Sequence, residues 1–191
     1  MPRVKGERRL EILKALAQML EQPKWGKITT AALAEKLDVS EAALYRHFAS
    51  KAQMYEGLIE FIESSVFTLA NKIVQDETDG HKQAAKLVEM LLAFAEKNPG
   101  MVRVMTGDAL VGEHERLQAR MNQFYDRFES TLKQALRAPG DGAQKPSDAD
   151  VTAHAGTLVR YAIGCLHQYA KSGFTKKPTE SYAAQRRFLA A

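Results

Sequence analysis

Hydrophobic residues recur along the chain at intervals of three and four positions, and the strict alternation typical of strands is nearly absent. This period predicts helices at about 6–21, 31–37, 41–48, 51–76, 82–97, 101–110, 113–137, 147–171 and 178–190. Pro23 and Gly26 are expected to end the first helix, and Asn98-Pro99-Gly100 the fifth. The segment 137–146 contains Pro and Gly and predicts a flexible connection. We therefore expect an all-α protein with a small N-terminal domain (1–51) and a larger helical domain (52–191).

The two short helices near 31–37 and 41–48 are joined by a tight turn and preceded by a supporting helix. This is the arrangement of the helix-turn-helix, whose second helix enters the major groove of DNA. A helical wheel places Leu44 and Phe48 on the inward face of the second helix, and Ala42 and Ala43 broadly opposite. The pattern therefore predicts binding of double-stranded DNA. The alternative is a small helical hairpin with no role in nucleic-acid binding.

The residues around this second helix have chemistry that suits DNA. Alanine methyls can touch a thymine methyl, and Tyr45 and His47 are long enough to reach phosphates. Arg46 can read a base or contact a phosphate, and Glu41 can stabilise the helix start or accept from a cytosine amino group. Lys51 begins the next helix, where free backbone amides favour phosphate. The predicted DNA-binding residues are Thr29, Thr30, Ser40, Glu41, Ala42, Ala43, Tyr45, Arg46, His47 and Lys51.

Positive charge is concentrated at the same end of the chain. The net charge of the 191 residues is +4. Residues 1–51 hold ten basic and six acidic residues, which leaves 17 of each in the rest of the chain. A polyanionic partner at the N-terminal quarter is consistent with this distribution, because phosphate contacts supply most non-specific affinity for nucleic acids. A solvated basic surface is the alternative.

Several classes of protein find no support in the sequence. No stretch approaches the roughly 20 apolar residues that cross a bilayer, and no secretory signal is evident. Cys165 cannot form an internal disulfide, so we expect a reduced residue packed in the core and a cytoplasmic protein. Phosphate loops and catalytic triads are absent, and the histidines share no ligand spacing, so we expect no enzyme activity, metal or cofactor.

The two long late helices carry an apolar seam. A helix-turn-helix that reads a two-fold site needs a dimer that sets the half-site distance, typically about 34–36 Å. Together with the same two helices of a second chain, the seam could form a four-helix bundle across the two-fold axis of the dimer. The alternative is that it only fills the core of one chain. The predicted dimer interface comprises Leu117, Met121, Phe124, Phe128, Leu158, Ala162 and Cys165.

The helix predicted at 51–76 has a core stripe that includes Leu58, Ile62, Leu69 and Ile73. Phe61 falls beside this stripe, so it could line a groove with the following helix and accept a peptide from a partner. The alternatives are that Phe61 packs on a neighbouring helix and that Asn98 is only a cap. The predicted partner-binding residues are Phe61, Ser65, Leu69, Met90, Ala93, Phe94, Lys97 and Asn98, of which the last two suit an acidic peptide.

The N-terminal quarter resembles the TetR family of transcriptional regulators. The resemblance is carried by Thr29-Thr30, Leu33-Ala34, Val39-Ser40, Leu44-Tyr45-Arg46-His47-Phe48 and Ser50-Lys51. The stretches 58–63, 97–100, 104–107 and 108–110 are also similar to the nucleoid occlusion branch of that family.

The resemblance implies a TetR-like fold with a three-helix DNA-binding domain and a C-terminal helical dimerisation domain. It also implies a nucleoid-associated homodimer, with higher oligomers on DNA as a further option, that binds dispersed chromosomal sites. When bound to DNA, such a protein antagonises assembly of the division protein FtsZ and needs no small-molecule inducer. The alternative function is that of a ligand-responsive TetR-type repressor.

Overall fold

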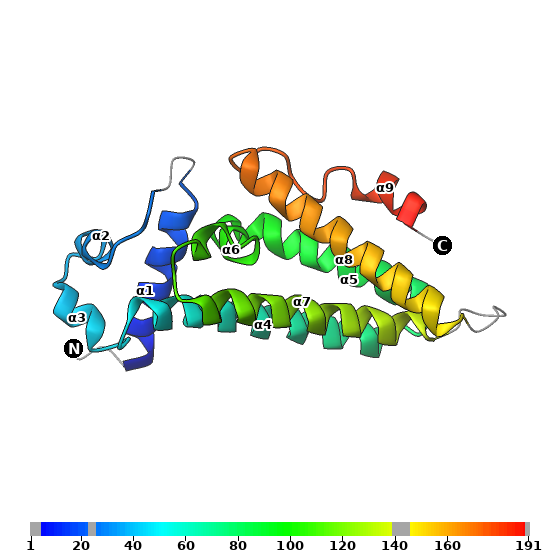
Figure 1. The fold of residues 1–191 in the computed structure, drawn as a ribbon, viewed down its shortest axis with the longest axis horizontal. Helices are drawn as coiled ribbons and strands as arrows, with labels where there is room; N and C mark the ends of the chain where they lie inside the picture. The colour runs from blue at the N-terminus through cyan, green and yellow to red at the C-terminus, as the bar shows by residue number, and fades with distance from the viewer. Residues whose placement is uncertain (1–4, 23–25, 139–145, 190–191) are drawn as a thin grey trace.

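The computed structural model describes residues 5–22, 26–138 and 146–189 (Figure 1). Within these ranges it has helices and no strand, and the predicted all-α class is confirmed. The elements are α1 (Lys5–Leu20), α2 (Thr30–Lys36), α3 (Glu41–Tyr45), α4 (Lys51–Asp76), α5 (Gly80–Lys97), α6 (Pro99–Met105), the 3-10 helix η1 (Asp108–Leu110), α7 (Glu115–Leu136), α8 (Asp148–Lys171) and α9 (Tyr182–Leu189). Figure 1 shows α1–α3, which we call the head, at one end of an elongated body formed by α4–α9.

Hydroxyl side chains fix where the helices of the head begin. Thr29, Ser40 and Ser50 each accept a hydrogen bond from the backbone N–H three residues later, at the starts of α2, α3 and α4. These bonds satisfy amides that a helix start leaves without partners. The predicted starts of these helices are therefore confirmed to within one residue. The end of α3 was predicted at 48, but the helix ends at Tyr45.

The body is built around α4 and α7, which run side by side along its length (Figure 1). Ion pairs fasten the two helices to each other: Arg116 Nε lies 2.7 Å from Glu56 Oε1, and Arg120 Nη2 lies 2.6 Å from Glu63 Oε2. On its inner face α7 also packs against α5 and α8. The core of the body therefore belongs to one chain.

This packing corrects the predicted dimer interface. The four predicted residues on α7 and Ala162 of α8 are at most 1% exposed within the single chain, and Leu158 of α8 is 4% exposed. A side chain that is already covered by its own chain cannot present its apolar surface to a second copy. Only Cys165 is half-buried. The corrected residues are Leu117, Met121, Phe124 and Phe128 of α7 and Leu158 and Ala162 of α8.

The head is fixed to the body through α1 and α6. A Cβ placed on Gly100 would lie only 2.2 Å from the carbonyl oxygen of Ala17, so glycine permits this close approach. The guanidinium of Arg103 is buried, and its Nε donates to the carbonyl oxygen of Leu20 at 2.8 Å. A cation at this position satisfies an unpaired carbonyl at the C-terminal end of α1 and complements the helix dipole.

Two large apolar residues lie on the surface. Leu69 of α4, which was predicted in the core stripe, is 45% exposed, and Leu10 of α1 is 47% exposed. The helix predicted at 101–110 is interrupted at Gly107, whose φ of 81° does not continue an α-helix, and resumes as η1. The predicted connection at 137–146 falls largely on residues 139–145, which lie outside the described residues, as does Pro23.

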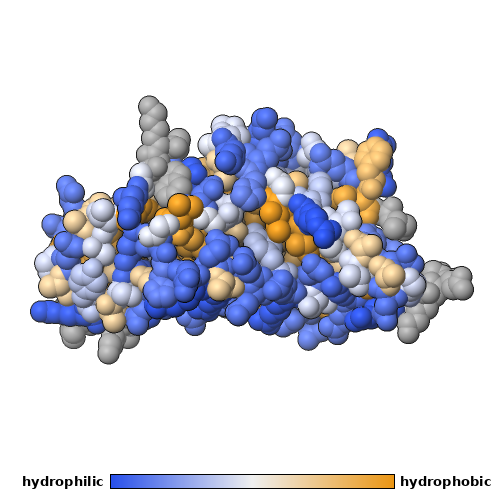
Figure 2. Space-filling view, in the orientation of Figure 1, coloured by the Kyte–Doolittle hydropathy of each residue, from blue (hydrophilic) through white to orange (hydrophobic). Residues whose placement is uncertain are grey.

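The face seen in Figure 2 is mostly hydrophilic, with hydrophobic surface confined to small patches, one of them over α9. Among the described helices, none combines the length and the apolar character that crossing a membrane requires.

Candidate nucleic-acid interface and partner groove

Burial along α3 separates an anchoring side from a presented side. Leu44 and Phe48 are each 1% exposed and pack into the core behind the helix. Ala42 is exposed and Ala43 is half-buried, while Tyr45 remains 45% exposed. The predicted orientation of this helix is therefore confirmed. Small side chains on the outer side would let the backbone come close to base edges in a major groove.

A hydrogen-bonded group links the first helix of the motif to α3. The hydroxyl of Thr30 donates to the carboxylate of Glu41, and the Tyr45 hydroxyl lies 3.5 Å from Thr30 Oγ1. The hydroxyl hydrogen of Thr30 is taken by Glu41, so its oxygen accepts from Tyr45. Glu41, predicted as a helix-start or base-reading residue, is thus engaged in holding α2 against α3.

Lys51, predicted to contact phosphate, has a partner within the chain. Its ammonium forms an ion pair with the carboxylate of Glu113, which lies just before α7. The side chains of Lys51 and Glu113 are only 20% and 12% exposed. Lys51 must therefore leave Glu113 to meet a phosphate fully. Sequence reasoning missed Glu113 because it lies 62 residues away and no local pattern connects the two positions.

Arg9 is a second residue that sequence reasoning missed. It lies on α1, is exposed, and its Nη1 donates to the carbonyl oxygen of His47 at 2.7 Å. Its guanidinium also lies 4.3 Å from the centre of the Phe48 ring. The concentration of basic residues in 1–51 was the one signal in the sequence that included Arg9. His47 itself is half-buried, with a ring nitrogen, Nδ1, that is enclosed and has no hydrogen-bond partner among the described residues.

A groove of about 290 Å³ lies where the head meets the body, with Phe61 on one wall. Phe61 is 41% exposed, and its ring centre lies 6.3 Å from that of Phe94. The second wall is α1, and the groove ends at the junction of α5 and α6. The groove is lined by Leu10, Leu13, Lys14, Ala17, Gln18, Glu21, Leu58, Phe61, Asn98 and Met101.

The groove predicted for Phe61 is therefore only partly correct. Asn98 lines it, but the opposite wall is α1 rather than α5. Leu69 and Met90 line a separate hollow further along α4. The Asn98 amide donates to the Phe94 carbonyl oxygen at 2.7 Å and makes no cap bond to α6.

The remaining predicted partner-binding residues lie on α4 and α5. Ser65 of α4 is half-buried and stands one turn from Phe61 on one side and from Leu69 on the other. On α5, Ala93 is half-buried and Lys97 is exposed.

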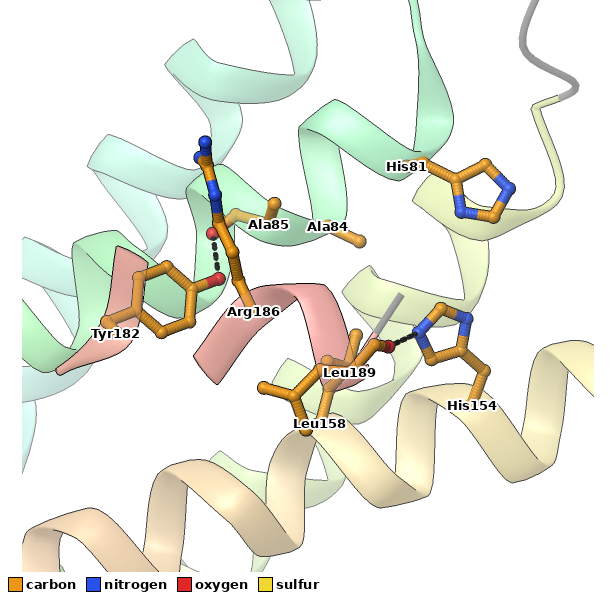
Figure 3. Close-up of a pocket in the computed structure, with 8 residues that line it drawn as sticks. All are labelled: His81, Ala84, Ala85, His154, Leu158, Tyr182, Arg186 and Leu189. Atoms are coloured by element: carbon orange, nitrogen blue, oxygen red, sulfur yellow. Dashed lines mark hydrogen bonds between the residues drawn. The ribbon is translucent and has the colours of Figure 1, made fainter. Parts of the chain in front are cut away.

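A smaller pocket of about 50 Å³ lies among α5, α8 and α9 (Figure 3). The rings of His81 and His154 stand 6.1 Å apart at its edge, and His154 Nε2 donates to the carbonyl oxygen of Leu189 at 2.6 Å. The Tyr182 hydroxyl donates to the carbonyl oxygen of Ala85 at 2.7 Å. These bonds fasten α9 to the body. In the described part of the chain, no group of three His, Cys, Asp or Glu side chains is placed to hold a metal ion.

Two family models match separate parts of the chain. Residues 12–58 match the model described as bacterial regulatory proteins, tetR family. Residues 79–191 match the SlmA-like C-terminal model, described as tetracyclin repressor-like, C-terminal domain.

The chain is similar over its length to proteins named nucleoid occlusion factor SlmA. The protein from Alteromonas mediterranea is 50% identical over 186 residues, covering 97% of this chain and 95% of the relative. The one from Idiomarina loihiensis is 49% identical, with 97% and 94% covered. The one from a Marinomonas species is 48% identical over 190 residues, with 100% and 96% covered.

Solved structures of regulators share the fold. The TetR family transcriptional regulator PfmR from Thermus thermophilus matches with a TM-score of 0.75 at 19% identity, covering 94% of this chain and 96% of that one. FadR from Bacillus subtilis, solved in complex with stearoyl-CoA, matches with a TM-score of 0.70 at 10% identity, with 95% and 97% covered. At such low identity these likenesses establish the helical fold and the order of its elements.

Proposed function

Because the chain belongs to the nucleoid occlusion factor SlmA family, within the wider TetR family, we propose that it binds duplex DNA as a dimer and, when bound, antagonises assembly of FtsZ. The observation that carries the proposal is the combination of the family match over nearly the whole chain with an outward-facing α3 and an accessible groove on α4. We place its action at the nucleoid, where the DNA-bound form accumulates.

The DNA-binding part of the proposal rests on the outer side of α3. Ala42 and Ala43 are the side chains closest to base edges, and they carry the sequence preference. Tyr45, Arg46 and His47 flank them and fix the register of the helix on the backbone. Thr29, Thr30 and Ser40 add hydroxyls at the two helix starts, and Lys51 reaches the backbone after release from Glu113.

The partner-binding part rests on α4, because this one helix runs from the head to the surface we assign to FtsZ. Lys51 begins it, and Phe61 lies on its exposed face about three turns later. Phe61 and Leu69 offer apolar surface, while Lys14 at the groove and the exposed Lys97 offer positive charge. This mixture suits a short peptide that carries both apolar and acidic residues.

The dimer in this proposal uses surface that one chain leaves uncovered. The outer side of α8 carries Ile163 and Cys165, which are half-buried, and α9 carries Phe188, which is 76% exposed. Apolar residues left accessible on adjoining helices suit a contact with a second copy. The buried seam of α7 then supports this face from within.

Sedimentation of FtsZ polymers tests the proposal. Purified FtsZ is polymerised with GTP, and the pelleted fraction is measured with this protein alone and with a duplex selected for binding. We expect the pelleted fraction to fall strongly only when the duplex is present. A fall of the same size without DNA, or no fall with it, would refute the proposal.

A pair of variants locates the partner surface in the same assay. Phe61→Ala removes the exposed ring and should abolish the effect on FtsZ while DNA affinity stays unchanged. Val111→Ala is the matched control, since Val111 is also exposed but lies at the turn between η1 and α7, away from the groove. If the two variants behave alike, the Phe61 groove is not the surface that FtsZ meets.

A further inference from the structure

Arg9, near the start of α1, contacts the turn that follows α3. We infer that Arg9 binds a DNA phosphate from outside the helix-turn-helix, while the same guanidinium holds the end of α3 in place. This inference rests on the proposed DNA binding. Figure 1 shows the N-terminal part of α1 meeting the chain where α3 passes into α4.

The guanidinium is fixed by two contacts of different kinds. Its Nη1 donates to the carbonyl oxygen of His47 at 2.7 Å, in the turn that follows α3. The central guanidinium carbon of Arg9, Cζ, lies 4.3 Å from the centre of the Phe48 ring, and Phe48 is itself buried. Aromatic faces attract guanidinium groups electrostatically. The contact therefore holds the long Arg9 side chain in one orientation.

Most of the hydrogen-bonding capacity of Arg9 remains available. A guanidinium carries five N–H donors in a planar fork, and the bond to His47 uses one of them. Arg9 is exposed, and among the described residues no carboxylate pairs with it. Its neighbour Arg8 differs, because Arg8 Nη1 lies 2.5 Å from Glu11 Oε2. Of the two adjacent arginines, only Arg9 keeps an unmatched positive charge next to α3.

A phosphate is the ligand that this arrangement suits. Arginine recognises phosphate through paired N–H donors, and a side chain that is already held loses little conformational freedom on binding. The position of Arg9 also matters, because it bonds to the residue directly after Arg46 at the end of the presented helix. When α3 lies in a major groove, the flanking sugar-phosphate backbone is the nearest polyanion.

Salt dependence separates a phosphate contact from a merely structural role. Binding to a fluorescent duplex is measured by anisotropy at several salt concentrations for the wild-type protein and for Arg9→Gln, Arg9→Lys and Arg8→Gln. Each phosphate neutralised contributes about −0.9 to the slope of log affinity against log salt concentration. Because a bound dimer carries two copies of Arg9, we expect Arg9→Gln to reduce the magnitude of the slope by about two and to weaken binding at least roughly tenfold at low salt.

The other variants control for charge and for folding. Arg8→Gln removes the same charge one residue away and should leave the slope unchanged. Arg9→Lys keeps the charge and should restore the slope. If Arg9→Gln binds more weakly with an unchanged slope, Arg9 only positions α3 and the inference is overturned. If the wild-type protein itself does not bind duplex DNA, the proposed function fails instead.

Discussion

Replacing Glu113 with glutamine should strengthen DNA binding, although Glu113 is not expected to touch DNA. In the free protein the Lys51 ammonium is held by the Glu113 carboxylate, with only 20% and 12% of the two side chains exposed. A phosphate that recruits Lys51 must compete with this carboxylate. The Glu113→Gln side chain would keep the shape and an accepting oxygen but lose the charge, so the competition would weaken.

The size of the effect follows from the burial of the pair. Exposed ion pairs contribute about 0–1 kcal/mol, whereas hydrogen bonds to charged groups shielded from water contribute about 1.5–3 kcal/mol. Lys51 and Glu113 lie between these limits, so we expect about 1–1.5 kcal/mol for each protomer of the dimer, which corresponds to roughly five- to twelvefold tighter binding per protomer. The salt slope should change little, because Lys51 neutralises a phosphate in both proteins. The unfolding free energy should fall by a similar amount because the pair is lost.

Fluorescence anisotropy with one duplex at fixed salt measures this effect. Glu56→Gln is the matched control, since it breaks the neighbouring pair with Arg116 and changes the net charge by the same amount. Glu113→Gln must bind more tightly than Glu56→Gln. Equal affinities of the two variants would mean that the effect comes from the change in net charge alone. Weaker binding by Glu113→Gln would mean that the Glu113 carboxylate positions Lys51 for DNA and does not compete with DNA for Lys51.

Three further predictions concern the scaffold, and urea unfolding measures each. Gly100→Ala should destabilise the protein by about 1–3 kcal/mol, because the new Cβ would lie 2.2 Å from the Ala17 oxygen, whereas Gly164→Ala meets nothing within 4 Å and should be neutral or stabilising. Phe128→Ala should cost about 3–5 kcal/mol while the folded fraction keeps its oligomeric state, since Phe128 is 0% exposed within one chain; dissociation into monomers without loss of stability would contradict this. The third concerns Glu96, whose pKa is lowered from its ordinary value of 4.5 mainly by the hydrogen bond from Thr179. Its contribution should therefore be complete above pH 4.5 and disappear as the pH falls through the lowered pKa; a stability difference from Glu96→Gln that grows on acidification would contradict it.

The elements that were predicted well are those whose signals are local. Apolar spacing and the caps Ser40 and Ser50 lie within a few residues of the helices that they define, whereas α2 is capped by Thr29 where the sequence had suggested Thr30. The same is true of α3, where Leu44 and Phe48 already indicated the buried side. Local periodicity therefore established the fold class and the orientation of the presented helix.

The predictions that failed depended on which surface covers each apolar stripe. The pattern of Phe124 and Phe128 is the same whether they pack against α5 and α8 of one chain or against a second copy, and only the tertiary packing distinguishes these cases. The groove beside Phe61 was predicted only in part, because α1, which is separated from α4 by α2 and α3, returns to form its second wall. Glu113 and Arg9 were missed for the same reason. Long-range partners leave no periodic signal in the sequence.

Mapping the chromosomal sites that the protein occupies in growing cells tests the central claim most directly. A protein that carries DNA-dependent control of FtsZ across the nucleoid should occupy many sites dispersed around the chromosome. Cells that carry Phe61→Ala should lose the inhibition of FtsZ assembly, while the occupancy of the chromosomal sites stays unchanged. Occupancy restricted to a few promoters and released by a small molecule would contradict the account and identify a ligand-responsive repressor.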